Sequence, residues 1–373
     1  MQIAIDAHSV GTQLAGNATY ITSLIEALAE IDQNNHYTLY VIKPEAVEKY
    51  TGRWSNFSVR RTLPHTPLIR IPITLAIELR RRPVDILFVQ YTAPLFVPCK
   101  VVTTIHDISY EHLPETYKRR SRFQMKLTIR HTARSADHVI ASSEYSRQDL
   151  IDTYHLPTEK VTAIPLAAPN FYAPVTDTDE LDRIRKKYDL AEDFILGVGS
   201  IQPRKNLGRL IEAYAMLAKK RNMPPLVLVG RKAWLSGETL GTKELAELGD
   251  KVRFTGFVPD EDLRPLYSAA KLFVYPSFFE GFGLPPLEAM QCGTPVITGD
   301  RTSLPEVVGE AGILVDPFDV QAIADNIEKV LLDDKLCDEL SRRGLERAKQ
   351  FSWKSTARQT LDVFERIVAK DKG

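Results

Sequence analysis

Short apolar runs alternate with helical segments along the whole chain, and this alternation restricts the possible folds more than any other feature. The runs begin, in chain order, at Ile3, Tyr37, Phe57, Asp85, Val101, His138, Val161, Phe194, Leu226, Val252, Leu272 and Pro295. Runs of this kind, with helices between them, are typical of parallel sheets that carry helices on both faces. We therefore predict an α/β protein with doubly wound sheets.

The chain divides into two halves that show the same pattern. Its 373 residues exceed the size of one ordinary compact core. The segment from Pro169 to Asp193 contains two prolines and the acidic cluster TDTDELD, a composition shift that is typical of a domain link. We predict one domain over residues 1–170 and a second over residues 190–351, followed by a helical segment over about residues 352–373.

The charge balance and the cysteines exclude several classes of protein. Lysine plus arginine and aspartate plus glutamate each number 48, so the net charge is zero, whereas nucleic-acid binders usually carry a basic excess. Cys99, Cys292 and Cys337 are unclustered, which gives no zinc spacing and favours a reducing compartment. The N-terminus shows no secretion signal, and no apolar run approaches the roughly 18 residues of a membrane span. We expect a cytoplasmic protein.

The stretch from Phe279 to Val296 combines acidic residues, glycines and prolines in a way that suits a ligand site. Its sequence is FEGFGLPPLEAMQCGTPV, with Glu280 and Glu288 eight positions apart. Because proline fits the first turn of a helix, Pro285 and Pro286 predict a helix start with Glu288 in its first turn, facing the positive end of the helix dipole. The two carboxylates suit the binding of hydroxyl groups, although an ordinary solvated surface also explains such a pair.

The glycines of the same stretch predict a close approach of the backbone to a ligand. Gly281 and Gly283 carry no Cβ. The backbone N–H groups of Phe282, Gly283 and Leu284 are expected to point from the helix start toward an anion. Anion-binding amides beside two carboxylates suit a sugar that is joined to a phosphate.

Two adjacent cations follow the apolar run FILGVGS. In open α/β sheets, ligands bind beyond the carboxyl ends of the strands, and Arg204 and Lys205 are expected at such an end. Adjacent positive side chains there can neutralise a diphosphate. The alternative is a solvated helix start, but cations at that place oppose the helix dipole.

These motifs resemble a known family. The segments GSIQPRKN near residue 200, FEGFGLPPLEAMQCGTPVI and SLPEVVGEAGILVDP are similar to the nucleotide-sugar site of the retaining glycosyltransferases of family 4. The resemblance extends over essentially the whole chain and is sharpest in the second half. It implies the GT-B fold, in which two Rossmann-like domains face each other across a cleft. It also implies transfer of a hexose, with retention, from a nucleotide diphosphate donor such as UDP-glucose or GDP-mannose to a hydroxyl of a polysaccharide or lipid-linked oligosaccharide.

The resemblance implies roles for residues in the second half, the donor-side domain. Arg204 and Lys205 match the pyrophosphate clamp and would stabilise the leaving group. Glu288 would hold the ribose hydroxyls. Glu280, with the amides of the glycine-rich turn, would hold hydroxyls of the sugar. Val258, in TGFVPDEDL, would lie against the base through backbone contacts.

In the first half, the acceptor-side domain, the resemblance points to Gly16 and His106. Gly16 ends the loop from Gly11 and would approach the donor phosphates, although an ordinary strand-to-helix turn also explains it. His106 follows VVTTI and would face the sugar, whereas the alternative is an Asp-His pair that caps the next element. In GT-B enzymes the last helix commonly crosses back to the first domain, so residues 352–373 are expected to belong to both.

Metal and dinucleotide cofactors are not expected. The pairs Asp177/Asp179 and Asp260/Asp262 resemble a metal motif of another glycosyltransferase fold, but neither ends an apolar strand. The dinucleotide motif GxGxxG is also missing at Gly197, which disfavours a nicotinamide-dependent dehydrogenase. We predict a transferase without a cofactor, the nucleotide-sugar being its substrate.

A basic helix is predicted from Lys118 to Arg134, with seven lysines or arginines and no acidic residue. With Arg80, Arg81 and Arg82 it makes the first half locally basic. Such a patch can lie on anionic lipid at the inner face of a membrane, or it can be a solvated face. Two further functions stay open: a nucleotide-sugar 2-epimerase of the same fold, and a catalytically silent nucleotide-sugar-binding subunit.

Overall fold

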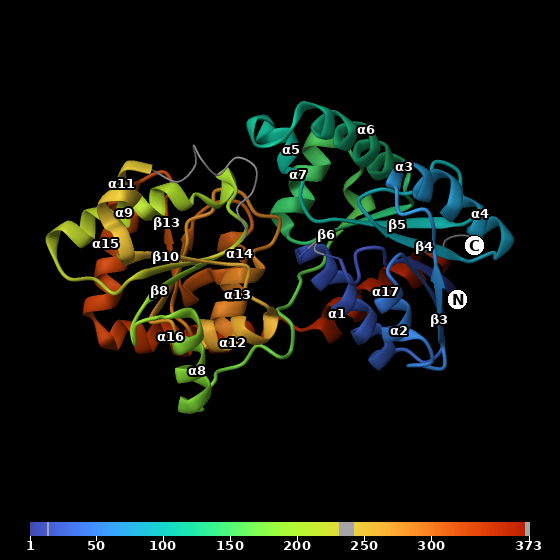
Figure 1. Ribbon diagram of the computed structural model, residues 1–373. Coiled ribbons are helices and arrows are strands. Elements are labelled where there is room, and N and C mark those ends of the chain that lie inside the picture. Colours follow the sequence, from blue (N-terminus) through green and yellow to red (C-terminus); the bar gives the residue numbers. More distant parts are fainter. Residues whose placement is uncertain (13–14, 231–241, 370–373) are drawn as a thin grey trace. The chain divides into compact units, whose positions relative to one another are not determined.

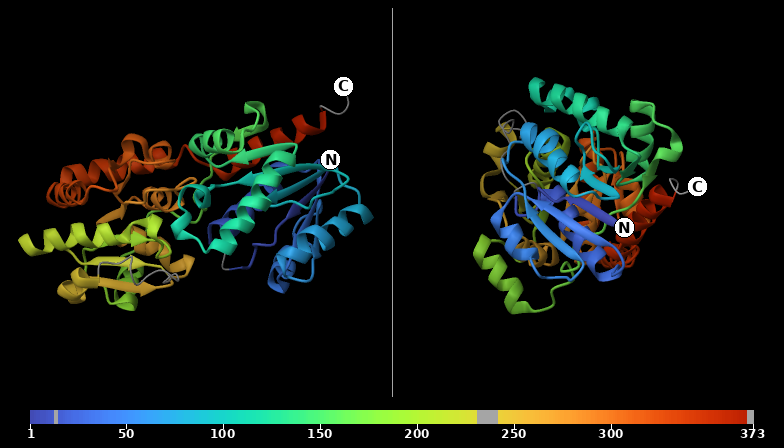
Figure 2. Two further views of the ribbon diagram at one scale, coloured as in Figure 1. Left: turned by 90° about the horizontal axis from the view of Figure 1, so that it is seen from above. Right: turned by 90° about the vertical axis from the view of Figure 1, so that its right-hand side faces the viewer.

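The computed structural model describes residues 1–12, 15–230 and 242–369, which form two compact units (Figure 1). Unit 1 consists of residues 1–166 and the C-terminal stretch from residue 352 onward, and unit 2 consists of residues 167–351. Each unit contains one parallel sheet with helices on both faces, as Figure 2 shows from two further directions. The doubly wound α/β fold expected from the sequence is confirmed.

The sheet of unit 1 has seven parallel strands in the order β3-β2-β1-β4-β5-β6-β7. They are β1 Gln2–Asp6, β2 His36–Val41, β3 Phe57–Arg61, β4 Ile86–Gln90, β5 Lys100–Ile105, β6 His138–Ala141 and β7 Val161–Ala163. Every residue of β4 and β6 is buried, as expected for strands that helices cover on both faces. Continuous apolar runs, rather than alternating ones, are therefore the pattern that identified these strands.

The described helices of unit 1 include a helical stretch between residues 67 and 81 that is built from three short pieces, the second a π-helix. The helices are α1 Ala15–Ile31, α2 Pro44–Tyr50, α3 Pro67–Ile69, the π-helix Arg70–Leu75, α4 Ala76–Arg81, α5 Ser109–His112, α6 Arg119–Ser135, α7 Glu144–Tyr154 and α17 Trp353–Ala369, with 3-10 turns at Pro114–Thr116 and Thr158–Lys160.

The last helix, α17, packs against α1 within unit 1. Phe364 packs edge-on against Phe88 of β4, with ring centroids 5.4 Å apart. Thr356 Oγ1 donates a hydrogen bond of 2.7 Å to the carbonyl oxygen of Pro165. The apolar face of α17 therefore forms part of the core of unit 1, although the rest of that unit comes from the first 166 residues.

The sheet of unit 2 has six parallel strands in the order β10-β9-β8-β11-β12-β13. They are β8 Ile195–Val198, β9 Leu226–Val229, β10 Val252–Gly256, β11 Leu272–Tyr275, β12 Val296–Gly299 and β13 Ile313–Val315. The described helices are α8 Thr178–Tyr188, α9 Leu207–Lys220, α11 Thr242–Leu248, α12 Asp260–Ala269, α13 Leu284–Gln291, α14 Leu304–Val308, α15 Val320–Leu332 and α16 Asp334–Ala348, with 3-10 turns at Pro203–Lys205, Gly249–Lys251 and Gly309–Ala311. The edge strand β13 was not expected from the sequence.

The segment from Pro169 to Asp193, which the sequence suggested as a link, holds helix α8 and lies in unit 2. Its acidic cluster begins that helix, because the Asp177 side chain accepts a hydrogen bond from the N–H of Asp179. From α8, Tyr188 Oη donates to the buried Asp262 carboxylate of α12 at 2.7 Å. A composition shift thus marked a helix start rather than a linker.

Each sheet has a point where the strand order reverses. In unit 1 this point lies between β1 and β4, and in unit 2 it lies between β8 and β11. Helices on the two sides of such a point run away from each other, which leaves a crevice at the carboxyl ends of the two strands. The segments after β8 and β11 are accordingly the first place to look for a ligand site in unit 2.

Unit 1 contains an ion pair that is almost inaccessible to solvent. Arg70 Nη1 lies 2.7 Å from Asp6 Oδ1, and both side chains are 1% exposed. Burial alone would raise the pKa of Asp6, but His8 and Arg70 together lower this pKa well below its usual range. The ion pair therefore joins the π-helix that carries Arg70 to the end of β1, and neither charged group can be solvated by water instead.

We expect Arg70→Met to lower the free energy of unfolding by about 3–5 kcal/mol at pH 7, because it leaves the Asp6 carboxylate buried without its partner. The loss should shrink toward pH 4, since the pKa of Asp6 rises in the variant and the carboxyl group becomes neutral in the fold. Urea unfolding at the two pH values measures both effects. Lys354→Met breaks an exposed pair with Glu30 in the same unit and should cost less than about 1 kcal/mol. Equal losses in the two variants would contradict this account.

Candidate active site

Arg204 and Lys205 lie in a 3-10 turn that directly follows the segment after β8. The turn ends at Asn206, whose backbone is left-handed with φ 59°. The Asn206 side-chain amide donates to the carbonyl oxygens of Pro276, at 3.1 Å, and Pro317, at 2.5 Å. This amide anchors the turn to the segment after β11, so the two cations are held at the point where the strand order reverses.

The loop after β11 brings Glu280 against both cations. Glu280 Oε1 lies 2.6 Å from Lys205 Nζ, and Oε2 lies 2.9 Å from Arg204 Nη1. Tyr275 Oη donates to the same Oε1 at 2.8 Å, and Ser277 Oγ lies 2.6 Å from it. The Glu280 side chain is only 8% exposed. We refer to Arg204, Lys205 and Glu280 as the charged cluster.

The charged cluster sets two cations against one carboxylate. Burial would raise the pKa of Glu280, but Arg204 and then Lys205 outweigh this effect and lower that pKa to about 2. Glu280 is therefore a carboxylate at neutral pH, and two cations face one anion in a nearly buried site. Two cations held close together in a site of low dielectric favour the binding of an anion.

The glycine-rich turn is fixed to the helix that follows β12. Gly283 has φ +113°, and a Cβ at this position would lie 2.8 Å from Leu304 Cδ2, so only glycine fits without displacement. The backbone N–H of Glu280 donates to Thr302 Oγ1 at 3.0 Å. Ser303 Oγ lies 2.7 Å from the carbonyl oxygen of Phe282. Gly281 and Phe282 are buried, and Leu284 opens α13.

Glu288 is not in the first turn of α13, contrary to the expectation. The helix begins at Leu284, so Pro285 and Pro286 are its second and third residues and Glu288 is its fifth. At that depth burial dominates and raises the pKa of Glu288 to about 7, although Tyr267 Oη donates to its Oε2 at 2.9 Å and opposes this shift. The helix dipole therefore does not hold Glu288 ionised.

His106 and Gly16 lie in unit 1. His106 Nδ1 is 2.6 Å from Ser142 Oγ and Nε2 is 3.2 Å from Gln90 Oε1, and burial lowers the pKa of His106 to about 4. His106 is thus a neutral ring among polar side chains at the carboxyl ends of β4, β5 and β6. The sequence also allowed an Asp-His pair at the start of the next element. In the structure Asp107 accepts a hydrogen bond of 2.9 Å from the N–H of Ser109, the first residue of α5.

Gly16 belongs to the first turn of α1 rather than to the loop in which the sequence placed it. It is exposed, and nothing lies within 4 Å of a Cβ built on it. Residues 13 and 14 of the expected loop lie outside the described residues. In unit 2, Val258 is buried between β10 and α12.

Comparisons with known proteins agree with this geometry. Residues 15–168 match the model described as "Glycosyltransferase Family 4", and residues 179–347 match "Glycosyl transferases group 1". O-antigen chain mannosyltransferase B of Escherichia coli is 40% identical over 271 residues, which cover 71% of this chain and 70% of that protein. The chain belongs to glycosyltransferase family 4.

Two further likenesses extend this result. Serotype-specific mannosyltransferase WbdA of Escherichia coli is 34% identical over 286 residues, which cover 74% of this chain but only 34% of WbdA, so the chain spans about a third of that protein. Sucrose-phosphate synthase from Thermosynechococcus elongatus has a TM-score of 0.77 at 23% identity, covering 99% of this chain and 100% of that structure. The latter likeness shows the fold, which is GT-B as the resemblance predicted.

Sequence reasoning about this family 4 chain missed the hydroxyl groups of the site. Tyr275 and Ser277 hydrogen-bond to Glu280, and Tyr267 hydrogen-bonds to Glu288. The signal that could have found the first two is the end of the run LFVYPS, where polar groups follow an apolar strand. No feature of the sequence indicated that Tyr267, inside α12, contacts Glu288.

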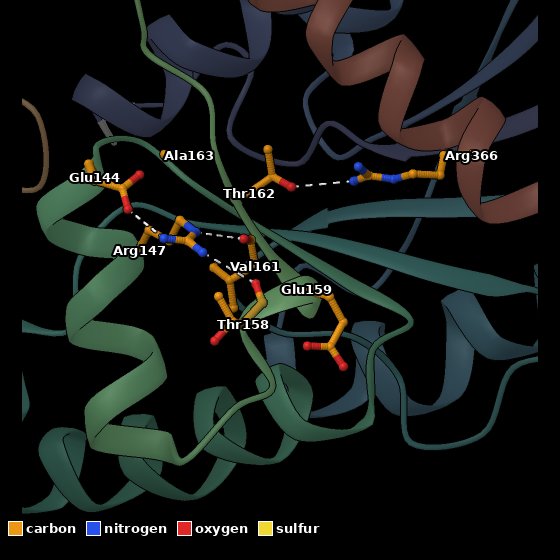
Figure 3. A pocket seen from close by; sticks show the side chains of 8 residues that line it. All are labelled: Glu144, Arg147, Thr158, Glu159, Val161, Thr162, Ala163 and Arg366. Carbon is orange, nitrogen blue, oxygen red and sulfur yellow. Dashed lines mark hydrogen bonds and ion pairs between the residues drawn. The ribbon is translucent and has the colours of Figure 1, made fainter.

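A hollow of about 440 Å³ lies in unit 1 of the glycosyltransferase, and none of the site residues described above lines it. Figure 3 shows Arg147 of α7 and Arg366 of α17 at its wall. Arg147 Nε donates to the carbonyl oxygen of Val161 at 2.9 Å, and Arg366 Nη2 donates to Thr162 Oγ1 at 3.3 Å. These guanidinium groups therefore bond to the edge strand β7 at the wall of the hollow.

The acidic pairs considered for a metal have other partners. Asp262 pairs with Arg183, at 3.3 Å, and with Lys187, and Asp177 caps α8. Within residues 1–12, 15–230 and 242–369, no group of three His, Cys, Asp or Glu side chains is arranged to hold a metal ion. The side chains of Asp177 and Asp262 thus have structural roles.

The raised pKa of Glu288 predicts that this residue lowers stability near neutral pH. An unfolded glutamate ionises near pH 4.5, whereas folded Glu288 keeps its proton up to about pH 7, so the stability of the wild type should fall between these values. We expect Glu288→Gln, whose amide oxygen can still accept from Tyr267, to be more stable than the wild type at pH 8 by about 3 kcal/mol. At pH 4.5 the two proteins should unfold alike.

Urea unfolding across the pH range measures this difference. Glu192→Gln, at an exposed position of unit 2, is the matched control and should show no comparable gain at pH 8. A Glu288→Gln variant that is less stable than the wild type at pH 8 would show that the ionised carboxylate stabilises the fold, which contradicts this prediction.

Proposed function

We propose that this family 4 glycosyltransferase moves a mannosyl group from GDP-mannose to a hydroxyl of a growing polysaccharide or lipid-linked oligosaccharide. The observation that carries the proposal is the charged cluster, whose two adjacent cations at the carboxyl ends of β8 and β11 suit a diphosphate. The names of the relatives, both mannosyltransferases, favour mannose over glucose and therefore GDP-mannose over UDP-glucose.

The proposed division of labour follows the chemistry of the donor. Arg204 and Lys205 stabilise the negative charge that grows on the leaving diphosphate. Glu288 accepts hydrogen bonds from the ribose hydroxyls, and its raised pKa means that donor binding draws its proton away. Val258 meets the base through its backbone. The amides of Phe282 and Gly283 lie at the sugar beside Glu280.

The acceptor hydroxyl attacks from the face that the diphosphate leaves, so that the configuration is retained. An oxygen of the departing diphosphate takes the acceptor's proton, and no side chain needs to serve as the base. His106, which burial keeps neutral, exchanges its hydrogen bond with Gln90 for one with a sugar hydroxyl, and Gly16 lets the start of α1 approach the donor phosphates. No metal cofactor takes part, because Arg204 and Lys205 occupy the role of the divalent ion.

Incubation of the chain with radiolabelled GDP-mannose and with UDP-glucose tests the proposal. We expect mannose to be released or transferred to a mannose-containing acceptor, with UDP-glucose turned over at least about tenfold more slowly. The rate should persist in EDTA. An interconverted sugar-nucleotide would indicate the 2-epimerase, and binding without turnover would indicate the silent subunit. A loss of activity in EDTA that Mn²⁺ restores would contradict the role of the two cations.

We propose in addition that helix α6 lies on an anionic membrane surface, where a lipid-linked acceptor would be found. Its outer stripe, spaced by three or four residues, places exposed Phe123 and Leu127 between Arg120, Arg130 and Arg134. Apolar side chains framed by arginines suit the boundary between headgroups and acyl chains. None of the described helices is long and apolar enough to cross a membrane.

A second exposed apolar stripe in unit 1 supports the proposed contact with a membrane surface. Ile69, Ile73 and Ile77 recur every fourth residue and are all exposed, and Arg80 to Arg82 follow them. Arg80 Nη2 also donates to the carbonyl oxygen of the highly exposed Phe96 at 3.2 Å, which ties the neighbouring loop to α4. Both stripes therefore pair aliphatic or aromatic side chains with arginine.

We expect the chain to cosediment with vesicles that contain anionic lipid, and to be released by about 0.5 M salt, because screening weakens the arginine contribution. Leu127→Ser should weaken this binding several-fold. Leu332→Ser is the matched control, since Leu127 is 64% exposed in unit 1 and Leu332 is 63% exposed in unit 2. Equal binding of both variants, or equal binding to neutral vesicles, would show that α6 is a solvated face.

A further inference from the structure

The hydroxyl group of Tyr275 lies inside the charged cluster, although nothing in the transfer described above uses it. Tyr275 is the last residue of β11 and is buried. Its Oη accepts a hydrogen bond from Lys205 Nζ and donates one of 2.8 Å to Glu280 Oε1. The Lys205 ammonium also lies 4.9 Å from the centroid of the Tyr275 ring. One phenol thus touches the cation through both its oxygen and its ring.

The acceptor capacity of Glu280 is largely used within the protein. Its Oε1 accepts hydrogen bonds from Lys205 and Tyr275 and lies 2.6 Å from Ser277 Oγ. Its Oε2 accepts a hydrogen bond from Arg204. A carboxylate offers about four lone-pair sites. Most of the hydrogen-bonding capacity of Glu280 therefore goes to holding the two cations in place, and little of it is left for the hydroxyls of a sugar.

We propose that Tyr275 is a positioning residue that acts through Lys205, with Glu280 as its partner in the same task. This proposal rests on the proposed function, because it assigns Tyr275 to the group that meets the diphosphate. A lysine ammonium is a point charge on a flexible four-carbon stem and has no geometry of its own. The phenol oxygen and the carboxylate oxygen supply that geometry from two sides.

The direction of the hydrogen bonds suits this task. Burial, followed by the charge of Glu280, raises the pKa of Tyr275 well above its ordinary value, so the phenol keeps its proton and donates it to Glu280. The oxygen lone pairs then face the Lys205 ammonium. A chain of donors from lysine through tyrosine to glutamate polarises each member and strengthens each bond.

Tyr275→Phe removes the hydroxyl while the ring remains against Lys205. Charge on the diphosphate is greatest in the transition state and in the released nucleoside diphosphate, so a misplaced ammonium weakens these states more than the bound sugar-nucleotide. We expect kcat to fall about tenfold to a hundredfold. The KM for GDP-mannose should change by less than about threefold, whereas the affinity for GDP should fall together with kcat.

Tyr214→Phe is the matched control. Tyr214 is a buried tyrosine of unit 2 whose Oη donates to the carbonyl oxygen of Pro224 at 3.0 Å, outside the charged cluster. Both substitutions delete one buried phenol hydroxyl, so their melting temperatures should fall by similar amounts. Only Tyr275→Phe should change kcat and GDP affinity. Equal kinetic effects of the two variants, or none in either, would overturn the proposal.

A double-mutant cycle identifies the residue through which Tyr275 acts. In a Lys205→Gln background, Tyr275→Phe should reduce GDP affinity by less than about threefold, because the cation that it positions is gone. Fully additive losses would overturn the proposal. If Lys205→Gln does not fold, Ser277→Ala serves instead: it removes another contact of the same Glu280 oxygen and should lower GDP affinity without adding fully to Tyr275→Phe.

Calorimetry with GDP and with UDP separates this proposal from the proposed function. The positioning role is read in the affinity for the diphosphate, which needs no turnover. A wild type that binds a nucleoside diphosphate but transfers no sugar would contradict the proposed function alone, provided that Tyr275→Phe weakens binding and Tyr214→Phe does not. A wild type that binds neither nucleotide would overturn both.

Discussion

The charged cluster of Arg204, Lys205 and Glu280 is the interaction on which the rest of unit 2 depends. Two cations cannot be held beside each other in a nearly buried place unless an anion compensates part of their charge and hydrogen bonds satisfy their donors. Glu280 supplies the anion, and Tyr275 and Ser277 supply further partners. The two cations are thereby fixed in one place at the carboxyl ends of β8 and β11.

The doubly wound sheet explains why the cluster forms where it does. Neighbouring strands β8 and β11 end side by side, while the helices that follow them lead in different directions. The chain must therefore turn at both strand ends without a helix to fill the crevice. Asn206 joins the two turns through Pro276, so a 3-10 turn and a loop that are 70 residues apart become one rigid surface.

Unit 1 has a reversal of strand order of the same kind, but different side chains lie beside it. Its own reversal of strand order, between β1 and β4, carries the buried pair of Asp6 and Arg70, in which the two charges compensate each other completely. The neighbouring His106 is kept neutral by burial and is satisfied by Ser142 and Gln90. Unit 1 thus has one buried ion pair and neutral polar groups at this place, whereas unit 2 has two cations that share one carboxylate, on sheets of the same construction.

The sequence by itself determined the fold class and the strands other than β13, because apolar periodicity is a local property, and its short motifs singled out Arg204, Lys205 and Glu280 as candidates. Only the tertiary structure decided which partners these charges have. Tyr275 reaches Glu280 through a strand end, and Tyr267 reaches Glu288 from another helix, so no spacing along the chain encodes either contact. The sequence likewise placed Glu288 at the dipole of a helix start, whereas its proton affinity is set by burial. Burial depends on all the elements packed around a group, and that sum exists only once the chain has folded.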